Sequence, residues 1–175
     1  MTVSAAAAAR HLPRVRLREL RADDAALLDR LGSRAVSGPW DYFDDPPHEL
    51  LRGQDYGGGW RVVEDRRGRT LGSVSFIQIP YGPNRRSLAW RIGITILPEH
   101  RHQGFGAAAQ RELASQLFAT TAANRVEADT DVENVPEQRS LERAGFQPEG
   151  THRGAQFREG RWHDRILYAR LRSDA

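Results

Sequence analysis

The sequence predicts an α+β, or mixed α/β, fold with one twisted and mostly antiparallel central sheet flanked by helices. Segments with the alternation or β-branched character of strands lie between segments with helical periodicity. Three strand-like segments in the middle of the chain follow one another through short turns, as in an antiparallel meander. No repeat or linker divides the 175 residues, so we expect one domain over 13–173 after a disordered tail over 1–12.

The first half of the chain is expected to contain a strand, helices and this meander. Residues 14–20 alternate apolar and charged side chains, as a half-buried strand does. Residues 23–32 start with two aspartates and have helical spacing, and residues 40–47 form an aromatic and acidic loop. A short helix is expected over 48–52. The three meander strands are expected at 60–64, 70–79 and 89–97.

The second half alternates helices and strands. Residues 104–121 show a long amphipathic helical pattern, with apolar side chains four residues apart on one face. A strand is expected over 125–129, and a helix over 134–144 is ended by Gly145. Two further strands, joined by a turn, complete the domain within 146–171.

Composition excludes several chemistries. The chain has no cysteine, which excludes disulfides, thiolate metal sites and a cysteine nucleophile. All 26 basic residues are arginine, which excludes a Schiff base or a lysine general base. The histidines lack the spacing of metal ligands, so no metal is expected.

Charge and hydropathy limit the partners. The net charge is +3 and the arginines are spread among acidic residues, so no nucleic-acid partner is expected. No apolar run reaches the roughly 20 residues that a bilayer span requires, so no membrane partner is expected. The chain is expected to be soluble and, with no cysteine, is compatible with a cytoplasmic location.

The turn before the long helix has the features of an anion site. Residues 101–106 join a buried strand to this helix, whose first N–H groups point outward at the positive end of its dipole. Gly104 and Gly106 let a ligand approach that backbone, and Arg101 and His102 add positive charge. Such turns also contain glycines for packing alone, so the turn leaves both interpretations open.

Two motifs carry a resemblance to a known family. The pattern R-x-x-G-x-G, at Arg101 to Gly106, resembles the acetyl-CoA signature of the GNAT superfamily of N-acetyltransferases. The stretch ENVPEQRSLERAGF resembles the N-x-x-S-x-x-x-x-E-K-x-G-F pattern of its ribosomal-protein-alanine (RimJ/RimL-like) branch, with Asn134, Glu142 and Gly145-Phe146 matching. The resemblance covers residues 14–172.

This resemblance implies a GNAT sheet that is splayed at an acetyl-CoA site. It implies direct transfer of acetyl to a primary amine, either of a small aminated metabolite or antibiotic or of a protein N-terminus. An inactive acyl-CoA-binding sensor or scaffold is the alternative, and a homodimer stays open. The cofactor-binding residues that it implies are Ile94, Ile96, Leu97, Arg101, His102, Gln103, Gly104, Phe105, Gly106 and Asn134.

The chain departs from the family pattern where a catalytic acid is expected. Glu137 replaces the usual serine, and Leu141 stands where another branch has tyrosine. Asn134 and Glu137 have the spacing of a capping box, which is the alternative to a catalytic role. The candidate catalytic residues are Asn134, Glu133 and Glu137.

Two acidic segments are candidates for the acceptor side. Glu127, Asp129, Asp131 and Glu133 alternate along one strand and either face solvent or attract a cationic amine. The loop that begins at Trp40 has aromatic and acidic side chains, which suit a cationic amine but also suit simple packing. The candidate acceptor-binding residues in it are Trp40, Asp41, Tyr42 and Asp44.

Overall fold

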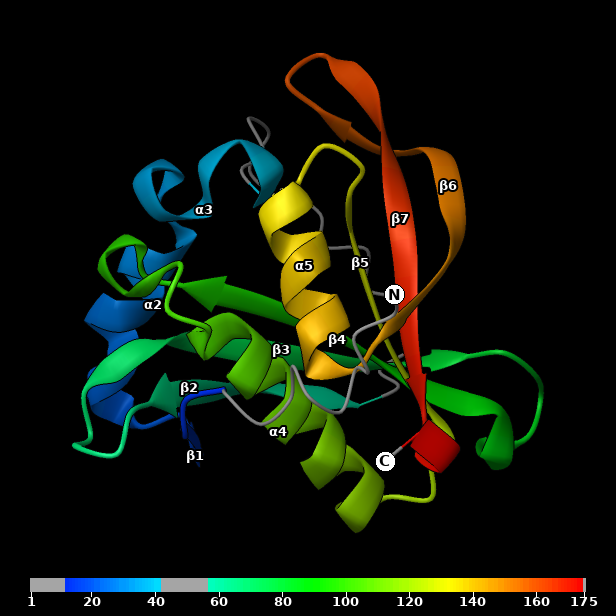
Figure 1. Ribbon diagram of the computed structural model, residues 1–175, viewed down its shortest axis with the longest axis horizontal. Helices are drawn as coiled ribbons and strands as arrows, with labels where there is room; N and C mark the ends of the chain where they lie inside the picture. The colour runs from blue at the N-terminus through cyan, green and yellow to red at the C-terminus, as the bar shows by residue number, and fades with distance from the viewer. Residues whose placement is uncertain (1–11, 42–56, 175) are drawn as a thin grey trace, which may run out of the picture.

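The computed structural model describes residues 12–41 and 57–174 as a seven-stranded sheet with helices packed against it (Figure 1). The strands are β1 (Arg16–Glu19), β2 (Gly58–Glu64), β3 (Thr70–Pro80), β4 (Leu88–Ile96), β5 (Arg125–Asp131), β6 (Gln147–Arg158) and β7 (Arg161–Leu171). The α-helices are α2 (Ala25–Gly32), α3 (Arg34–Asp41), α4 (Phe105–Thr120) and α5 (Val135–Ala144). The predicted mixed α/β class is confirmed.

The sheet has the order β1-β2-β3-β4-β5-β7-β6, and every neighbouring pair is antiparallel except β4 and β5. The two parallel strands pair only at Trp90 with Val126 and at Arg91 with Glu127. Beyond these residues β4 runs across the view in Figure 1 while β5 turns away from it. The predicted splay of the sheet is therefore present at the β4–β5 junction.

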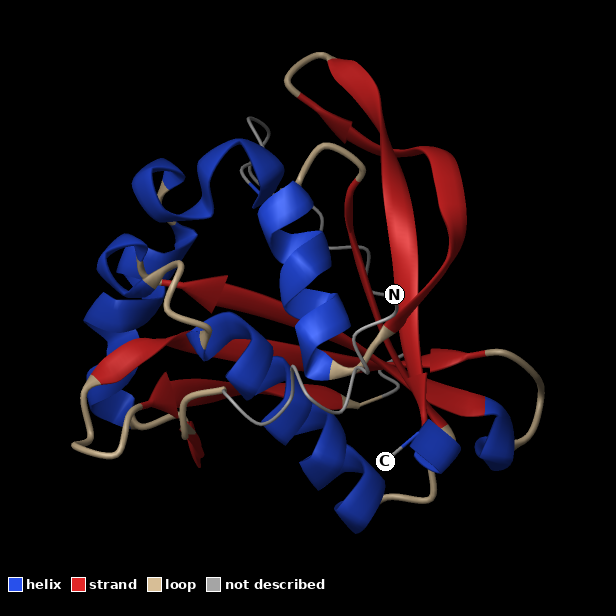
Figure 2. Cartoon of the chain, in the orientation of Figure 1, coloured by secondary structure: helices blue, strands red, loops and turns tan. Residues whose placement is uncertain are grey.

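One face of the sheet carries the main hydrophobic core. The helices α4 and α5 lie over this face, as the blue helices in front of the red strands show (Figure 2). Leu113 and Phe118 of α4 pack in one cluster with Val74 of β3, Trp90 of β4 and Tyr168 of β7. This packing fixes the start of α4 relative to the splay, because helix and strands share one close-packed core.

A buried ion cluster lies at the start of α2. Arg18 of β1 donates two bonds of 2.7 Å to Asp24 and one of 2.5 Å to Glu64 of β2. The bond from Arg18, helped by the Arg21 N–H, lowers the pKa of Asp24 to about 2. The cluster ties the start of α2 to the edge of the sheet.

The helix α3 differs from the prediction, which assigned no element to residues 33–39 and began a loop at residue 40. Residues 34–41 are helical, with a kink where Gly38 has a φ of 63° and Pro39 follows. A Gly-Pro pair predicts a turn. The helical segments on either side of it are short, so the sequence pattern does not indicate them. The predicted tail over 1–12, except Leu12, and the predicted helix over 48–52 lie outside the described residues.

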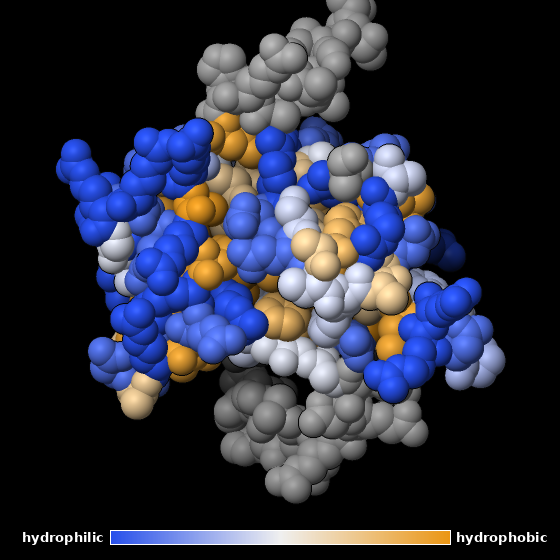
Figure 3. Space-filling view, turned by 90° about the horizontal axis from the view of Figure 1, so that it is seen from below, coloured by the Kyte–Doolittle hydropathy of each residue, from blue (hydrophilic) through white to orange (hydrophobic). Residues whose placement is uncertain are grey.

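The surface seen in Figure 3 is mostly hydrophilic, with small hydrophobic areas between charged side chains. Among the described residues, no helix has the length and apolar character needed to cross a membrane.

Candidate active site

The turn before α4 forms a cradle of backbone N–H groups. His102 and Gly104 both adopt left-handed backbone conformations, with φ of 60° and 83°. Alternation of such residues with ordinary ones makes a concave nest that binds anions. Gly104 is the N-cap of α4 and has no side chain that could bond to the first N–H groups of the helix. These groups therefore face the same space.

Gly106 leaves room at this cradle where any side chain would fill it. A Cβ at this position would lie 3.1 Å from Ser140 Oγ of α5 and 3.9 Å from carbons of Ile94 and Ile96. The glycine therefore allows a ligand to pass between α4, α5 and the end of β4.

Arg101 has a structural role at the same turn. Its Nε donates to the Ile96 carbonyl at 2.8 Å, and its Nη2 donates to the carbonyl of Val36 in α3. The guanidinium thus ties α3 to the end of β4 and places its positive charge beside the cradle.

A cavity of about 930 Å³ runs from the cradle into the splay. Strand residues from both sides of the β4–β5 junction line it, together with residues of α3, α4 and α5. The predicted site residues in its described lining are Trp40, Ile94, Ile96, Arg101, His102, Gly104, Gly106, Asn134 and Glu137. A volume of this size is typical of a cofactor site.

Four predicted residues lie outside this described lining. The Leu97 N–H donates to the Leu71 carbonyl, and its side chain is buried against α2 and α3. Gln103 turns back to the Glu99 carbonyl, and Phe105 packs against the main core. Glu133 is exposed. The predicted Tyr42 and Asp44, and the side chain of Asp41, lie outside the described residues.

Asn134 caps α5, as the sequence predicted. Its side-chain oxygen accepts from the Glu137 N–H at 3.4 Å, and its Nδ2 donates to Thr130 Oγ1 at 3.1 Å. Its own N–H donates to the Asp131 carbonyl, whereas the predicted capping box would have it donate to the Glu137 side chain. Asn134 is 9 % exposed and lines the cavity, so one side chain both caps the helix and faces the ligand space.

Glu137 belongs to a polar network between the two long helices. Gln110 of α4 is buried, donates its Nε2 to the Glu137 carboxylate and accepts from Ser140 Oγ at 2.9 Å. Ser140 also lines the cavity but was not predicted as a site residue. Its position follows from the packing of α5 on α4, which the sequence pattern does not show.

The three members of the acidic row that lie on β5 do not form a solvated surface, whereas Glu133, beyond the end of the strand, is exposed. Glu127 is completely buried and accepts from Arg91, Arg125 and the Tyr81 hydroxyl. Asp129 accepts from Arg165 Nε at 2.7 Å, and its other oxygen lies 3.7 Å from Arg91 Nε. Glu127 and Asp129 are therefore neutralised by arginines from β4, β5 and β7.

Asp129 is the member of this row that lines the cavity. Alternation along β5 puts it on the same face as Glu127, which pairs with Arg91 of β4. This is the face opposite α4, because the neighbouring Ala128 and Val126 pack into the α4 core. Asp129, rather than the predicted Glu133, is thus the β5 carboxylate that reaches the splay from that side.

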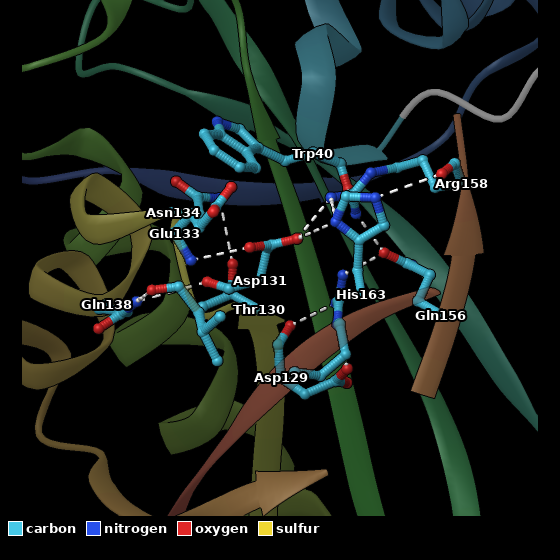
Figure 4. Close-up of polar contacts among 12 residues, drawn as sticks. Trp40, Asp129, Thr130, Asp131, Glu133, Asn134, Gln138, Gln156, Arg158 and His163 are labelled. Atoms are coloured by element: carbon cyan, nitrogen blue, oxygen red, sulfur yellow. Dashed lines mark hydrogen bonds and ion pairs between the residues drawn. The ribbon is translucent and has the colours of Figure 1, made fainter. Parts of the chain in front are cut away.

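Asp131 lies in a buried cluster next to the splay, where its side chain points toward Arg158 and His163 (Figure 4). His163 Nε2 lies 3.2 Å from the Arg158 carbonyl and donates to it, while Nδ1 lies 2.8 Å from Arg158 Nη2 and 3.1 Å from Asp131 Oδ2. Arg158 also donates to the Trp40 carbonyl at 3.1 Å. The cluster therefore connects the β6–β7 hairpin to α3 and β5.

Replacing Asp131 by asparagine is expected to cost about 3–5 kcal/mol of unfolding free energy, because it leaves the Arg158 cation buried without its counter-charge. Urea denaturation measures the change. The exposed Asp29→Asn variant is the control, with an expected change below about 0.5 kcal/mol. Equal stability of the two variants would show that the buried pair does not stabilise the fold.

The same carboxylate gives a pH dependence. Burial raises the pKa of Asp131, but the Glu133 N–H and the Arg158 guanidinium outweigh it and hold the pKa below its ordinary value. Its stabilisation is therefore complete above the unfolded-state pKa and is lost as the pH falls through the folded-state pKa. The Asp131→Asn variant should lose less stability on acidification than the parent chain.

The chain matches the family model described as the acetyltransferase (GNAT) domain over residues 14–147. It therefore belongs to the GNAT acetyltransferase domain family, and the resemblance found in the sequence is confirmed. It is 26 % identical over 110 residues to the uncharacterized N-acetyltransferase YoaA of Bacillus subtilis. The match covers 63 % of this chain and spans 60 % of the length of that relative.

Solved structures share the whole fold. RimJ of Mycobacterium smegmatis, in complex with CoA-disulfide, matches with a TM-score of 0.77 at 22 % identity, covering 93 % of this chain and 84 % of that one. The spermidine N-acetyltransferase of Vibrio cholerae, in complex with CoA and spermine, matches with a TM-score of 0.72 at 23 % identity, covering 91 % and 96 %. The GNAT fold class is confirmed by both.

Proposed function

We propose that this protein is an N-acetyltransferase that moves acetyl directly from acetyl-CoA to a primary amine. The observation that carries the proposal is the cavity that leads from the α4 cradle into the splay between β4 and β5. Its two ends have the chemistry of two substrates: backbone donors suit a pyrophosphate, and Asp129 suits an amine. The relatives named above bind CoA or act on amines by their descriptions, which supports the proposal.

The cofactor fits the described residues. The nest at His102 and Gly104 would hold the pyrophosphate, and Gly106 would let the pantetheine arm pass. The arm would then follow Ile94 and Ile96, where β4 has left β5 and its backbone groups on that side have no strand partner in the described sheet. Backbone N–H groups in this stretch would stabilise the oxyanion of the thioester carbonyl.

Asp129 is proposed to take the proton of the amine. The neutral nitrogen attacks the thioester carbon, the C–N bond forms and the C–S bond breaks. The nitrogen proton passes to the Asp129 carboxylate, directly or through a water, and the departing thiolate takes a proton from solvent. Asp129 lies on the face opposite α4, so the amine would enter from the side away from the cofactor cradle.

Trp40 is proposed to border the acceptor. It lines the cavity, and its ring lies 6.0 Å from the Arg158 guanidinium, which also binds its carbonyl. The indole is thus held at the mouth of the splay by the buried cluster (Figure 4).

Release of free thiol from acetyl-CoA tests the function. The chain has no cysteine, so every thiol detected is product CoA. A panel of aralkylamines, peptides, polyamines and aminoglycosides should include amines that raise release well above the rate of acetyl-CoA hydrolysis. Tight binding of CoA without release for any amine would instead support the sensor or scaffold alternative.

A further inference from the structure

The sheet face opposite α4 carries mostly small residues near the splay. The antiparallel register places Val62, Ser73 and Thr95 in one row across β2, β3 and β4. The next row contains Trp60, Ser75 and Gly93. Four of these six residues are small, so the surface of the sheet is recessed between the apolar side chains that border it.

A groove of about 550 Å³ lies over this floor. Its lining includes Leu28 and Leu31 of α2 and Trp60 of β2. The groove shares Ser75 and Gly93, among other residues, with the main cavity, so it is continuous with the splay. It therefore opens on the side from which the acceptor is proposed to enter.

The described lining of the groove carries no charged side chain. It consists of leucine, isoleucine, tryptophan, serine, threonine and glycine residues. Trp60 and Leu28 are 49 % and 38 % exposed, so large apolar surface is available to a ligand. Burying an ammonium group against such a surface is costly, whereas burying an apolar group is favourable.

Ser73 adds a polar feature to this lining. The residue is 1 % exposed, and its hydroxyl has no hydrogen-bond partner among residues 12–41 and 57–174. Buried hydroxyl groups in proteins are nearly always bonded, so this hydroxyl is available to a ligand group that reaches it from the groove. An amide or hydroxyl group near the amine has the required chemistry.

The charges near Asp129 favour a single ammonium group. Arg165 already pairs with this carboxylate at 2.7 Å, and Arg91 lies 3.7 Å from its other oxygen. One amine can approach Asp129, but further ammonium groups of the same molecule would meet these arginines or the uncharged groove. The described site therefore lacks the excess negative charge that a polyamine needs.

Building on the proposed function, we infer that the groove binds an uncharged apolar group attached next to the acceptor amine. The substrate class is a monoamine whose neighbouring group is aliphatic or aromatic. A free aralkylamine and a peptide whose first residue is apolar share this chemistry. Polyamines are disfavoured, in contrast to the Vibrio cholerae neighbour that is named for spermidine.

The test compares kcat/KM for phenethylamine, a phenylalanine-initiated peptide amide and spermidine. Both apolar acceptors should exceed spermidine by about tenfold or more, the scale on which apolar pockets discriminate. The acceptor with the higher kcat/KM shows whether the natural acceptor is a free amine or a peptide. Ser73→Ala should lower kcat/KM for the peptide amide several-fold and leave phenethylamine unchanged, since only the peptide offers a partner for the hydroxyl.

A charge placed in the groove should reverse the preference. Leu28→Glu adds a carboxylate to an exposed position of the wall, and the apolar-to-spermidine ratio should fall about tenfold or more. Ala26→Glu adds the same charge to the same helix outside the groove and should change the ratio less than about twofold.

Two results would overturn the inference while leaving the proposed function intact: a parent preference for spermidine, or equal ratios in Leu28→Glu and Ala26→Glu. Absence of transfer to every amine, with CoA still bound by calorimetry, contradicts the proposed function and the inference with it.

Discussion

Gly106→Glu is expected to weaken CoA binding by about 100-fold or more, which corresponds to about 2.8 kcal/mol. The side chain would enter the passage between α4, α5 and β4, where even a Cβ lies 3.1 Å from Ser140 Oγ. Its carboxylate would also meet the pyrophosphate at the helix end that otherwise favours anions. Isothermal titration calorimetry with CoA measures the loss.

Two variants separate the causes. Gly106→Ala adds only the Cβ, which the rotation of Ser140 can accommodate, and should weaken binding much less than glutamate. Ala119→Glu places the same charge at an exposed position near the other end of α4 and should leave binding within about twofold. If Gly106→Glu binds CoA as the parent does, the cradle before α4 is not the cofactor site.

Asp129→Asn is expected to lower kcat/KM by about 10²–10³-fold, because the variant keeps the shape but cannot take the amine proton. Asparagine still offers an oxygen to Arg165, so the fold and CoA binding should persist. The loss should appear mainly in kcat, and raising the pH should recover part of it, since more of the amine is then neutral in solution.

Glu133→Gln is the matched control. Glu133 is exposed and outside the described lining of the cavity, so the rate should stay within about twofold of the parent. The opposite pattern, with a slow Glu133 variant and a normal Asp129 variant, would return the base to the residue that the sequence favoured.

Periodicity predicted most elements because each strand and helix has one buried face. The meander and the long helix α4 were found at nearly their observed positions. The helix α3 was missed because Gly38 and Pro39 interrupt it, and its stability comes from contacts such as the Arg101 bond to the Val36 carbonyl. Such long-range bonds leave no local pattern in the sequence.

The cofactor side of the site was more predictable than the acceptor side. The cradle at residues 101–106 is a continuous segment whose glycines and helix start are visible locally. Asp129 was seen in the acidic row, but its selection depends on the splay and on partners from β4 and β7. The apolar groove depends on the register of three strands and on α2 above them, which no single segment encodes.

A single-turnover experiment with acetyl-CoA labelled in its acetyl group tests direct transfer across the splay. With protein in excess and a preferred amine present, the label should appear on the amine as fast as it leaves CoA. No label should remain on the denatured protein, which has no cysteine to hold it. Label retained on the protein, or label that stays on bound CoA with every amine, would contradict the account.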